Sequence, residues 1–118
     1  MIKATLTCYD QIRYLKFSVT GHAGADVKGQ DLVCASASIL LYTLAQTVDD
    51  MEQHGDFTCE PIIEVDEGDA LVACHCNSDE TYAEAVTAFK TIWAGFELLA
   101  HDYPQYVELN PVGKAVKA

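Results

Sequence analysis

Apolar residues recur at every second position near the amino end of the chain, then at every third or fourth position, and then at every second position again. This change of period constrains the fold more than any other feature. Two segments near the amino end alternate apolar and polar side chains, which is typical of half-buried β-strands. The next segment places apolar residues three and four apart, which indicates one face of a helix. The same order then recurs. The expected strands are residues 2–8, 12–20, 57–65 and 70–76, and the expected helices run over about residues 32–54 and from a cap at Asn77 to just before Pro104.

This order predicts an α+β fold, with a four-stranded antiparallel sheet that carries both helices packed on one face. Asp31 is the expected N-cap of the first helix, and Gly55 its end. Pro61 has no amide proton, which places the third strand at an edge or a bulge. Residues 105–118 are interpreted as a short extended segment followed by a loose basic tail. The uncovered sheet face is expected to meet either solvent or a second copy of the chain.

Charge restricts the ligands that suit this chain. Its 118 residues, taken as a single domain 1–118, include 18 acidic and 7 basic side chains, which gives a net charge of −11. Such a field repels phosphate and therefore disfavours nucleic acid or an anionic membrane as the main ligand. A basic partner fits better.

Cysteine usage bears on the compartment. The chain has five cysteines, an odd number, and they lie in apolar segments rather than in loops. A secreted disulfide framework is therefore not expected. No window approaches the roughly 18 uninterrupted apolar residues of a membrane helix, and the amino end does not resemble a signal peptide. The sequence predicts a reduced, cytoplasmic protein.

His22 and Cys34 are the residues best placed for catalysis. His22 follows the second expected strand, and Cys34 begins the first expected helix. A cysteine thiol has an ordinary pKa of about 8.5, so a nucleophilic cysteine needs surroundings that favour the thiolate. The free N–H groups of a helix start favour negative charge, and a nearby imidazolium favours it further. The spacing permits a catalytic His22–Cys34 pair, although a buried cysteine and a surface histidine would give the same pattern.

The residues around this pair have supporting assignments. Gly24 and Gly29 are assigned to a flexible loop that brings His22 and Cys34 together. Asp31 could either orient His22 as a third catalytic residue or cap the helix, and its position favours the cap. Ser38 is interpreted as a packing or substrate-groove residue, because no second base stands near it in the sequence.

Three segments stand out together: Gly21-His22-Ala23, then Gly29-Gln30-Asp31-Leu32-Val33-Cys34-Ala35, and then Ser38. They resemble the signature of the ribosomal-processing cysteine protease family called Prp. The likeness extends to the strand pair before the motif, the long helix after it, the acidic hairpin and the closing helix with Tyr103-Pro104. The chain departs mildly from the pattern at Leu32, Ser36 and Ala37, which affects packing rather than chemistry.

The resemblance implies a thiol endopeptidase that removes a short amino-terminal extension from large-subunit ribosomal protein twenty-seven. His22 would be the general base and later the proton donor, and Cys34 the nucleophile, with neither a metal nor a cofactor. Backbone N–H groups of the helix start, including that of Cys34, are expected to hold the oxyanion. A homodimer is expected, because the family is typically dimeric. An apolar pocket under Tyr42 or Phe96 would suit aromatic substrate residues near the cleaved bond.

Other interpretations have to be weighed against the protease. Cys74-His75-Cys76 resembles part of a metal site, to which Cys59 on the paired strand could add a third sulfur, but strand periodicity puts His75 on the opposite face from Cys74 and Cys76. Buried thiols are the better interpretation. A single reactive Cys34 would suit a redox enzyme, yet no resolving cysteine follows at the usual spacing. A non-catalytic acidic module that binds basic ribosomal proteins would also fit the charge.

Overall fold

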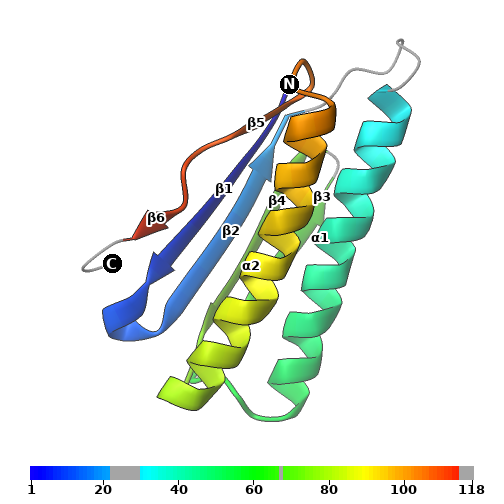
Figure 1. Ribbon diagram of the computed structural model, residues 1–118. Coiled ribbons are helices and arrows are strands. Elements are labelled where there is room, and N and C mark those ends of the chain that lie inside the picture. Colours follow the sequence, from blue (N-terminus) through cyan, green and yellow to red (C-terminus); the bar gives the residue numbers. More distant parts are fainter. Residues whose placement is uncertain (22–29, 67, 115–118) are drawn as a thin grey trace.

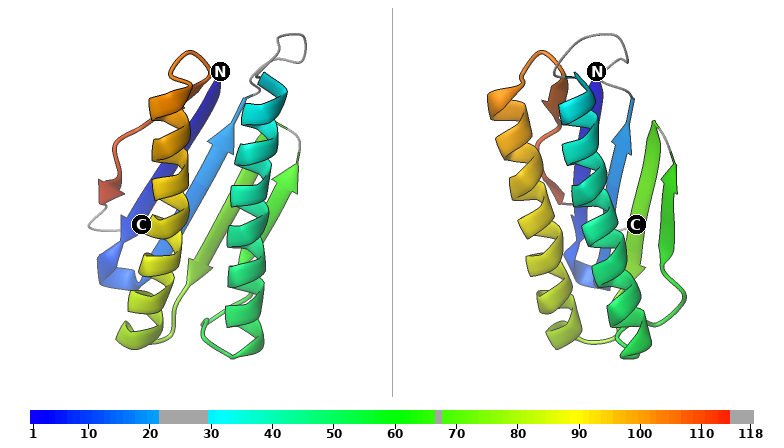
Figure 2. Two further views of the ribbon diagram at one scale, coloured as in Figure 1. Left: turned by 45° about the vertical axis from the view of Figure 1, so that its right-hand side comes forward. Right: turned by 90° about the vertical axis from the view of Figure 1, so that its right-hand side faces the viewer.

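A mixed β-sheet carries two long helices on one face (Figure 1; Figure 2). The computed structural model describes residues 1–21, 30–66 and 68–114. The elements are β1 (Ile2–Tyr9), a 3₁₀ turn η1 (Asp10–Ile12), β2 (Tyr14–Thr20), α1 (Gln30–Gln53), β3 (Ile62–Asp66), β4 (Asp69–His75), α2 (Asp79–Asp102), β5 (Val107–Leu109) and β6 (Gly113–Lys114). The α+β class and the order of the four predicted strands and two predicted helices are therefore confirmed.

The sheet differs from the prediction in its last two strands. Its order is β3-β4-β2-β1-β5, and β6 also pairs with β1. The strands β1 to β4 pair antiparallel as expected, but β5 and β6 both run parallel to β1. The prediction of a purely antiparallel four-stranded sheet is thus wrong. Strands of three and two residues are too short to show a period of two, and their pairing with the amino end is non-local.

The edge position of β3 agrees with the proline argument. Pro61 directly precedes β3, so its missing amide proton costs no hydrogen bond within the strand. The strand begins later than predicted, because Phe57 forms only an isolated bridge with Cys76. The hairpin that β3 forms with β4 closes where Asp66 pairs with Asp69, and Gly68 there adopts a positive φ of 79°.

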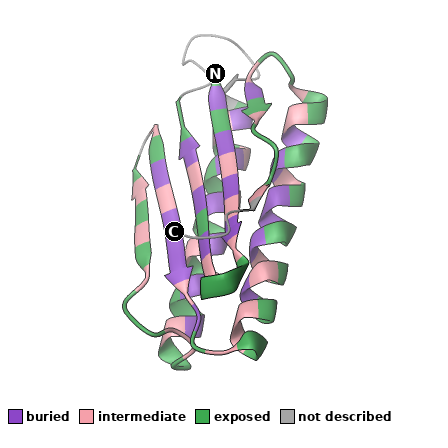
Figure 3. Cartoon of the chain, turned by 90° about the vertical axis from the view of Figure 1, so that its left-hand side faces the viewer, coloured by how far each residue is buried: buried purple, intermediate pink, exposed green. Residues whose placement is uncertain are grey.

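Alternating side chains of the strands build the core, as the striped burial in Figure 3 shows. Phe17 of β2 is fully buried beneath α2, where its ring centroid lies 5.8 Å from that of Trp93 and 5.5 Å from that of Phe96. Edge-to-face and tilted contacts of this kind add to the stabilisation from burial alone. This aromatic cluster fixes α2 over the centre of the sheet and leaves α1 over β3 and β4.

The end of α1 and the start of α2 each have a specific cap. Gly55, at a φ of 77°, follows α1, and the Asp56 N–H donates to the Met51 carbonyl as in a Schellman motif. For α2 the N-cap is Ser78, whose hydroxyl accepts from the Thr81 N–H at 3.1 Å. The prediction of Asn77 as the cap is wrong by one residue. The Asn77 side chain instead donates to the Gly55 carbonyl at 2.7 Å and so joins the two helix ends.

Apolar side chains of α1 lie both on its buried face and on its solvent-exposed face. By length and composition alone, Leu32–Gln53 could cross a membrane, with a mean hydropathy of 1.4. In the fold, Val33, Leu44 and Val48 are fully buried beneath the helix. Its outer face nevertheless keeps large apolar side chains in solvent near the amino end, and Ile39 is 63% exposed.

Candidate active site

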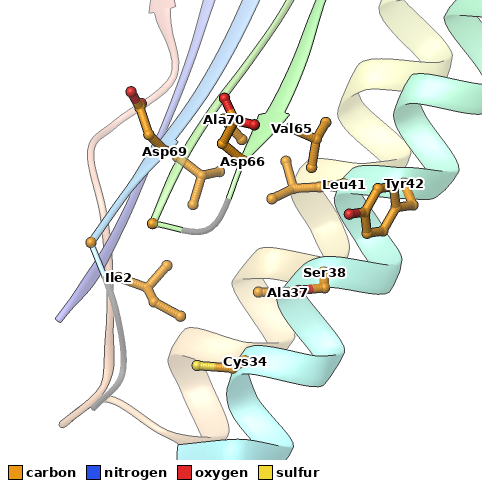
Figure 4. Close-up of a pocket in the computed structure, with 13 residues that line it drawn as sticks. Ile2, Cys34, Ala37, Ser38, Leu41, Tyr42, Val65, Asp66, Asp69 and Ala70 are labelled. Atoms are coloured by element: carbon orange, nitrogen blue, oxygen red, sulfur yellow. The ribbon is translucent and has the colours of Figure 1, made fainter. Parts of the chain in front are cut away.

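Cys34 lies on α1 close to the ends of the central strands. It is the fifth residue of the helix and is half-buried. Figure 4 shows its side chain directed from α1 toward the end of the sheet that carries Ile2. Cys34 therefore packs against the edge of the core and lines a cavity there.

The start of α1 differs from the prediction. The helix begins at Gln30, so Asp31 is its second residue and not its N-cap. Aspartate is favoured both at an N-cap and in the first turn, because both positions attract negative charge, and residue type alone does not distinguish them. The N–H of Cys34 also lies within the helical pattern, where an N–H donates to the carbonyl four residues earlier. The amides without a partner inside the helix are those of the first turn, including Gln30 and Leu32, and not that of Cys34.

His22, Gly24 and Gly29 lie outside the described residues. The approach of His22 to Cys34 and the loop assignment of the two glycines therefore stay predictions. The described residues that flank this segment are Gly21, at the end of β2, and Gln30, at the start of α1.

Gly21 fixes the point from which the chain leaves β2 toward His22. Its N–H donates to the Gly68 carbonyl at 2.9 Å, which ties β2 to the β3–β4 hairpin. Its φ is +93°, and a Cβ at this position would overlap the backbone carbonyl oxygen of Met1. Glycine is required here for both reasons.

We expect Gly21→Ala to lower the free energy of unfolding by about 2–4 kcal/mol, since the strained φ and the displaced Met1 carbonyl both contribute. Gly55→Ala is the matched control, because Gly55 also has a positive φ but nothing lies within 4 Å of its added Cβ. That variant should lose only about 1 kcal/mol. Urea unfolding of the two variants measures the difference, and equal losses would show that the Met1 contact is unimportant.

A cavity of about 310 Å³ opens beside Cys34, between α1 and the ends of β2, β3 and β4. Its walls are mainly apolar and come from both layers of the fold: Ile2, Val19, Ala37, Leu41, Val65 and Ala70. Backbone near the tip of the β3–β4 hairpin also lines it, but the carboxylates of Asp66 and Asp69 point away from the space in Figure 4. The cavity suits an apolar side chain.

Three residues of α1 add functional groups to this cavity. Cys34, Ser38 and Tyr42 follow one another at four-residue steps and all line it. Ser36 does not line the cavity, and neither does Phe96, which is fully buried in the core. The contribution of Val65 and Ala70 was not predicted, because no local sequence pattern shows that the second hairpin lies opposite the first helix.

The other cysteines form no comparable site. Cys74 and Cys76 are each only 1% exposed, while His75 lies on the other face, with its Nδ1 2.7 Å from the Thr58 hydroxyl. A hydrogen bond with Cys76, together with burial, raises the pKa of the Cys74 thiol, which stays protonated. Within the described ranges, no group of three or more metal-ligating side chains occurs. The interpretation of Cys74 and Cys76 as buried thiols is confirmed.

Comparison with known proteins adds to this geometry. A family model described as cysteine protease Prp matches residues 1–108. The structure of SMU.848 from Streptococcus mutans is 24% identical, with a TM-score of 0.67 over 98% of this chain and 96% of its own. The ribosomal processing protease Prp from S. aureus, solved in complex with a substrate peptide, is 22% identical, with a TM-score of 0.66 over 93% and 98% of the two chains.

The S. aureus protease has also been solved with a covalently linked product peptide, and that structure is 22% identical, with a TM-score of 0.67 over 98% of this chain and 100% of its own. At this level of identity, the structural likenesses show a shared fold. No curated protein matches the chain.

Proposed function

The chain belongs to the cysteine protease Prp family, and from this premise we propose that it removes the amino-terminal extension of large-subunit ribosomal protein twenty-seven during ribosome maturation. The observation that carries the proposal is the half-buried Cys34 on α1, beside a cavity that can receive a peptide side chain. The description of the S. aureus relative as a ribosomal processing protease supports the choice of substrate. A cysteine protease is neither a non-catalytic binding module nor a redox enzyme, so those two alternatives are set aside.

The proposed reaction proceeds through an acyl-enzyme. The Cys34 thiolate attacks the scissile carbonyl carbon, and the carbonyl oxygen becomes an oxyanion that the free amides of the first turn of α1 stabilise. His22, protonated by the Cys34 thiol, passes that proton to the leaving amine as the C–N bond breaks. Water then attacks the thioester with His22 as the base, which releases the new carboxyl end and restores the thiol.

Charge and shape support a basic substrate with an apolar residue at the cut. The net charge of −11 favours encounter with a basic ribosomal protein, because complementary charge raises the association rate. The mainly apolar cavity next to Cys34 favours an apolar or aromatic side chain near the scissile bond. Charge thus brings the substrate to the enzyme, and the cavity selects the bond.

We also place the enzyme in the cytoplasm as a homodimer. All five cysteines are free, which suits a reducing compartment. Leu32 and Ile39 of α1 and Leu98 of α2 are 56%, 63% and 68% exposed, and a second copy would cover such apolar side chains. Light scattering should report a dimer, and Ile39→Glu should convert it to a monomer. A monomeric wild-type protein would contradict the proposed assembly.

The substrate is tested with purified components. Ribosomal protein twenty-seven with its extension, incubated with the enzyme, should lose that extension at one bond, as read by mass spectrometry. Other ribosomal proteins with extended amino ends serve as controls and should stay intact. Full-length protein twenty-seven that remains uncut at equimolar enzyme would contradict the assignment.

A further inference from the structure

Tyr42 is unlike the other tyrosines of the chain. The chain has six tyrosines, and Tyr42 alone is exposed, at 57%, whereas the other five are half-buried. Its hydroxyl makes no hydrogen bond to any part of the chain that the structure describes. Yet the side chain lines the same cavity as Cys34. An exposed aromatic ring at a cavity can bury a large area when a ligand arrives.

The position of Tyr42 relative to Cys34 sets the distance at which it acts. The two residues are eight apart on one helix, and Ser38 lies halfway between them on the same side (Figure 4). At 1.5 Å per residue, the helix separates them by about 12 Å along its axis. An extended peptide advances about 3.3 Å per residue, so this distance corresponds to between three and four peptide residues.

We propose that Tyr42 is a specificity-determining residue that packs against an apolar substrate side chain three or four positions from the scissile bond. The substrate then runs extended along α1, past Ser38, with the cavity between the two contact points. The wall opposite Tyr42 comes from the β3–β4 hairpin, where Val65 and Ala70 are apolar. Packing between these walls favours an apolar side chain over a charged one. The inference rests on the proposed proteolysis at Cys34.

A cycle of enzyme and peptide variants tests this contact. The peptides are the cleaved substrate sequence and versions in which the side chains three and four positions from the bond, on one side or the other, are replaced by glycine. In the wild-type enzyme, the glycine replacement on one side should lower kcat/KM by roughly 5- to 20-fold, mainly through KM. In Tyr42→Ala, the parent peptide should show the same loss, and the glycine replacement should change kcat/KM less than about twofold.

Two further variants separate substrate contact from structural damage. Tyr42→Phe should keep most of the activity, since the ring face and not the hydroxyl makes the contact. Ile62→Ala removes another partly exposed apolar side chain, 39% exposed on β3 and outside the cavity, and should change nothing.

If the loss of kcat/KM from Tyr42→Ala and the loss from the glycine replacement multiplied when the two were combined, the two changes would act independently. That result would overturn the inference while leaving the protease assignment intact. A wild-type enzyme that cleaves none of the peptides would contradict the proposed proteolysis, and the inference with it.

Discussion

Replacing Cys34 with serine should leave a folded protein that binds peptide but no longer cleaves it, with kcat/KM lower by at least about 10³-fold. The cause is chemical, since a serine hydroxyl remains protonated where a cysteine can supply a thiolate. The volume changes little, and Cys34 is only half-buried, so the stability should change by less than about 1 kcal/mol. Mass spectrometry of the products measures turnover, and fluorescence anisotropy of a labelled peptide measures binding.

Cys59→Ser is the matched control for this experiment. Cys59 is exposed, lies before β3 and does not line the cavity, so its replacement should leave kcat/KM unchanged. Undiminished cleavage by Cys34→Ser would remove Cys34 from the reaction and with it the proposed mechanism.

His22→Ala should lower kcat/KM by about 10²- to 10⁴-fold, which is the usual contribution of a positioned acid–base group. Without the imidazole, the thiol loses the base proposed to take its proton, and the leaving amine loses its proposed proton donor. Added imidazole should restore part of the activity, because a small base can occupy the vacated space.

The control for His22→Ala is a histidine that lies far from Cys34. His54 follows the carboxyl end of α1, at the opposite end of the helix from Cys34, and is exposed. His54→Ala should retain full activity. If His22→Ala retained full activity as well, another group would have to be the base.

Local signals in the sequence predicted the elements that depend on local physics. The apolar alternation of β1 and β2 and the helical stripes of α1 and α2 each reflect burial on one face, and these elements appear where the periodicity places them. Pro61 indicated that the third strand lies at an edge or is bulged there, and β3 does lie at the edge of the sheet, although it begins only after Pro61.

The errors occurred where tertiary contacts decide the outcome. The parallel pairing of β5 with β1 joins Val107 to Ile2, and no local pattern encodes such a contact. Asn77 was expected to cap α2, but it is engaged by the Gly55 carbonyl, and Ser78 takes its place. The Asp31 error is local instead: Asp31 lies inside α1, and its residue type could not exclude this position because acidic residues are favoured in the first turn as well as at the cap.

The candidate site divides in the same way. The motif around Cys34 could be predicted from the sequence, because the chemistry requires particular residue types near a helix start. The cavity could not be predicted, since the wall opposite α1 comes from the β3–β4 hairpin, about 30 residues further along the chain. That Tyr42 lines a substrate-sized cavity follows only from the tertiary structure, which places the hairpin wall opposite α1.

Site-resolved alkylation tests whether His22 activates the Cys34 thiol. Iodoacetamide is added at pH 6, and mass spectrometry follows the labelling of Cys34 and of the more exposed Cys59 in the same molecules. An activated Cys34 should react at least about tenfold faster than Cys59 in the wild-type protein and lose that advantage in His22→Ala. Faster labelling of Cys59 in the wild-type protein, as exposure alone predicts, would contradict the claim.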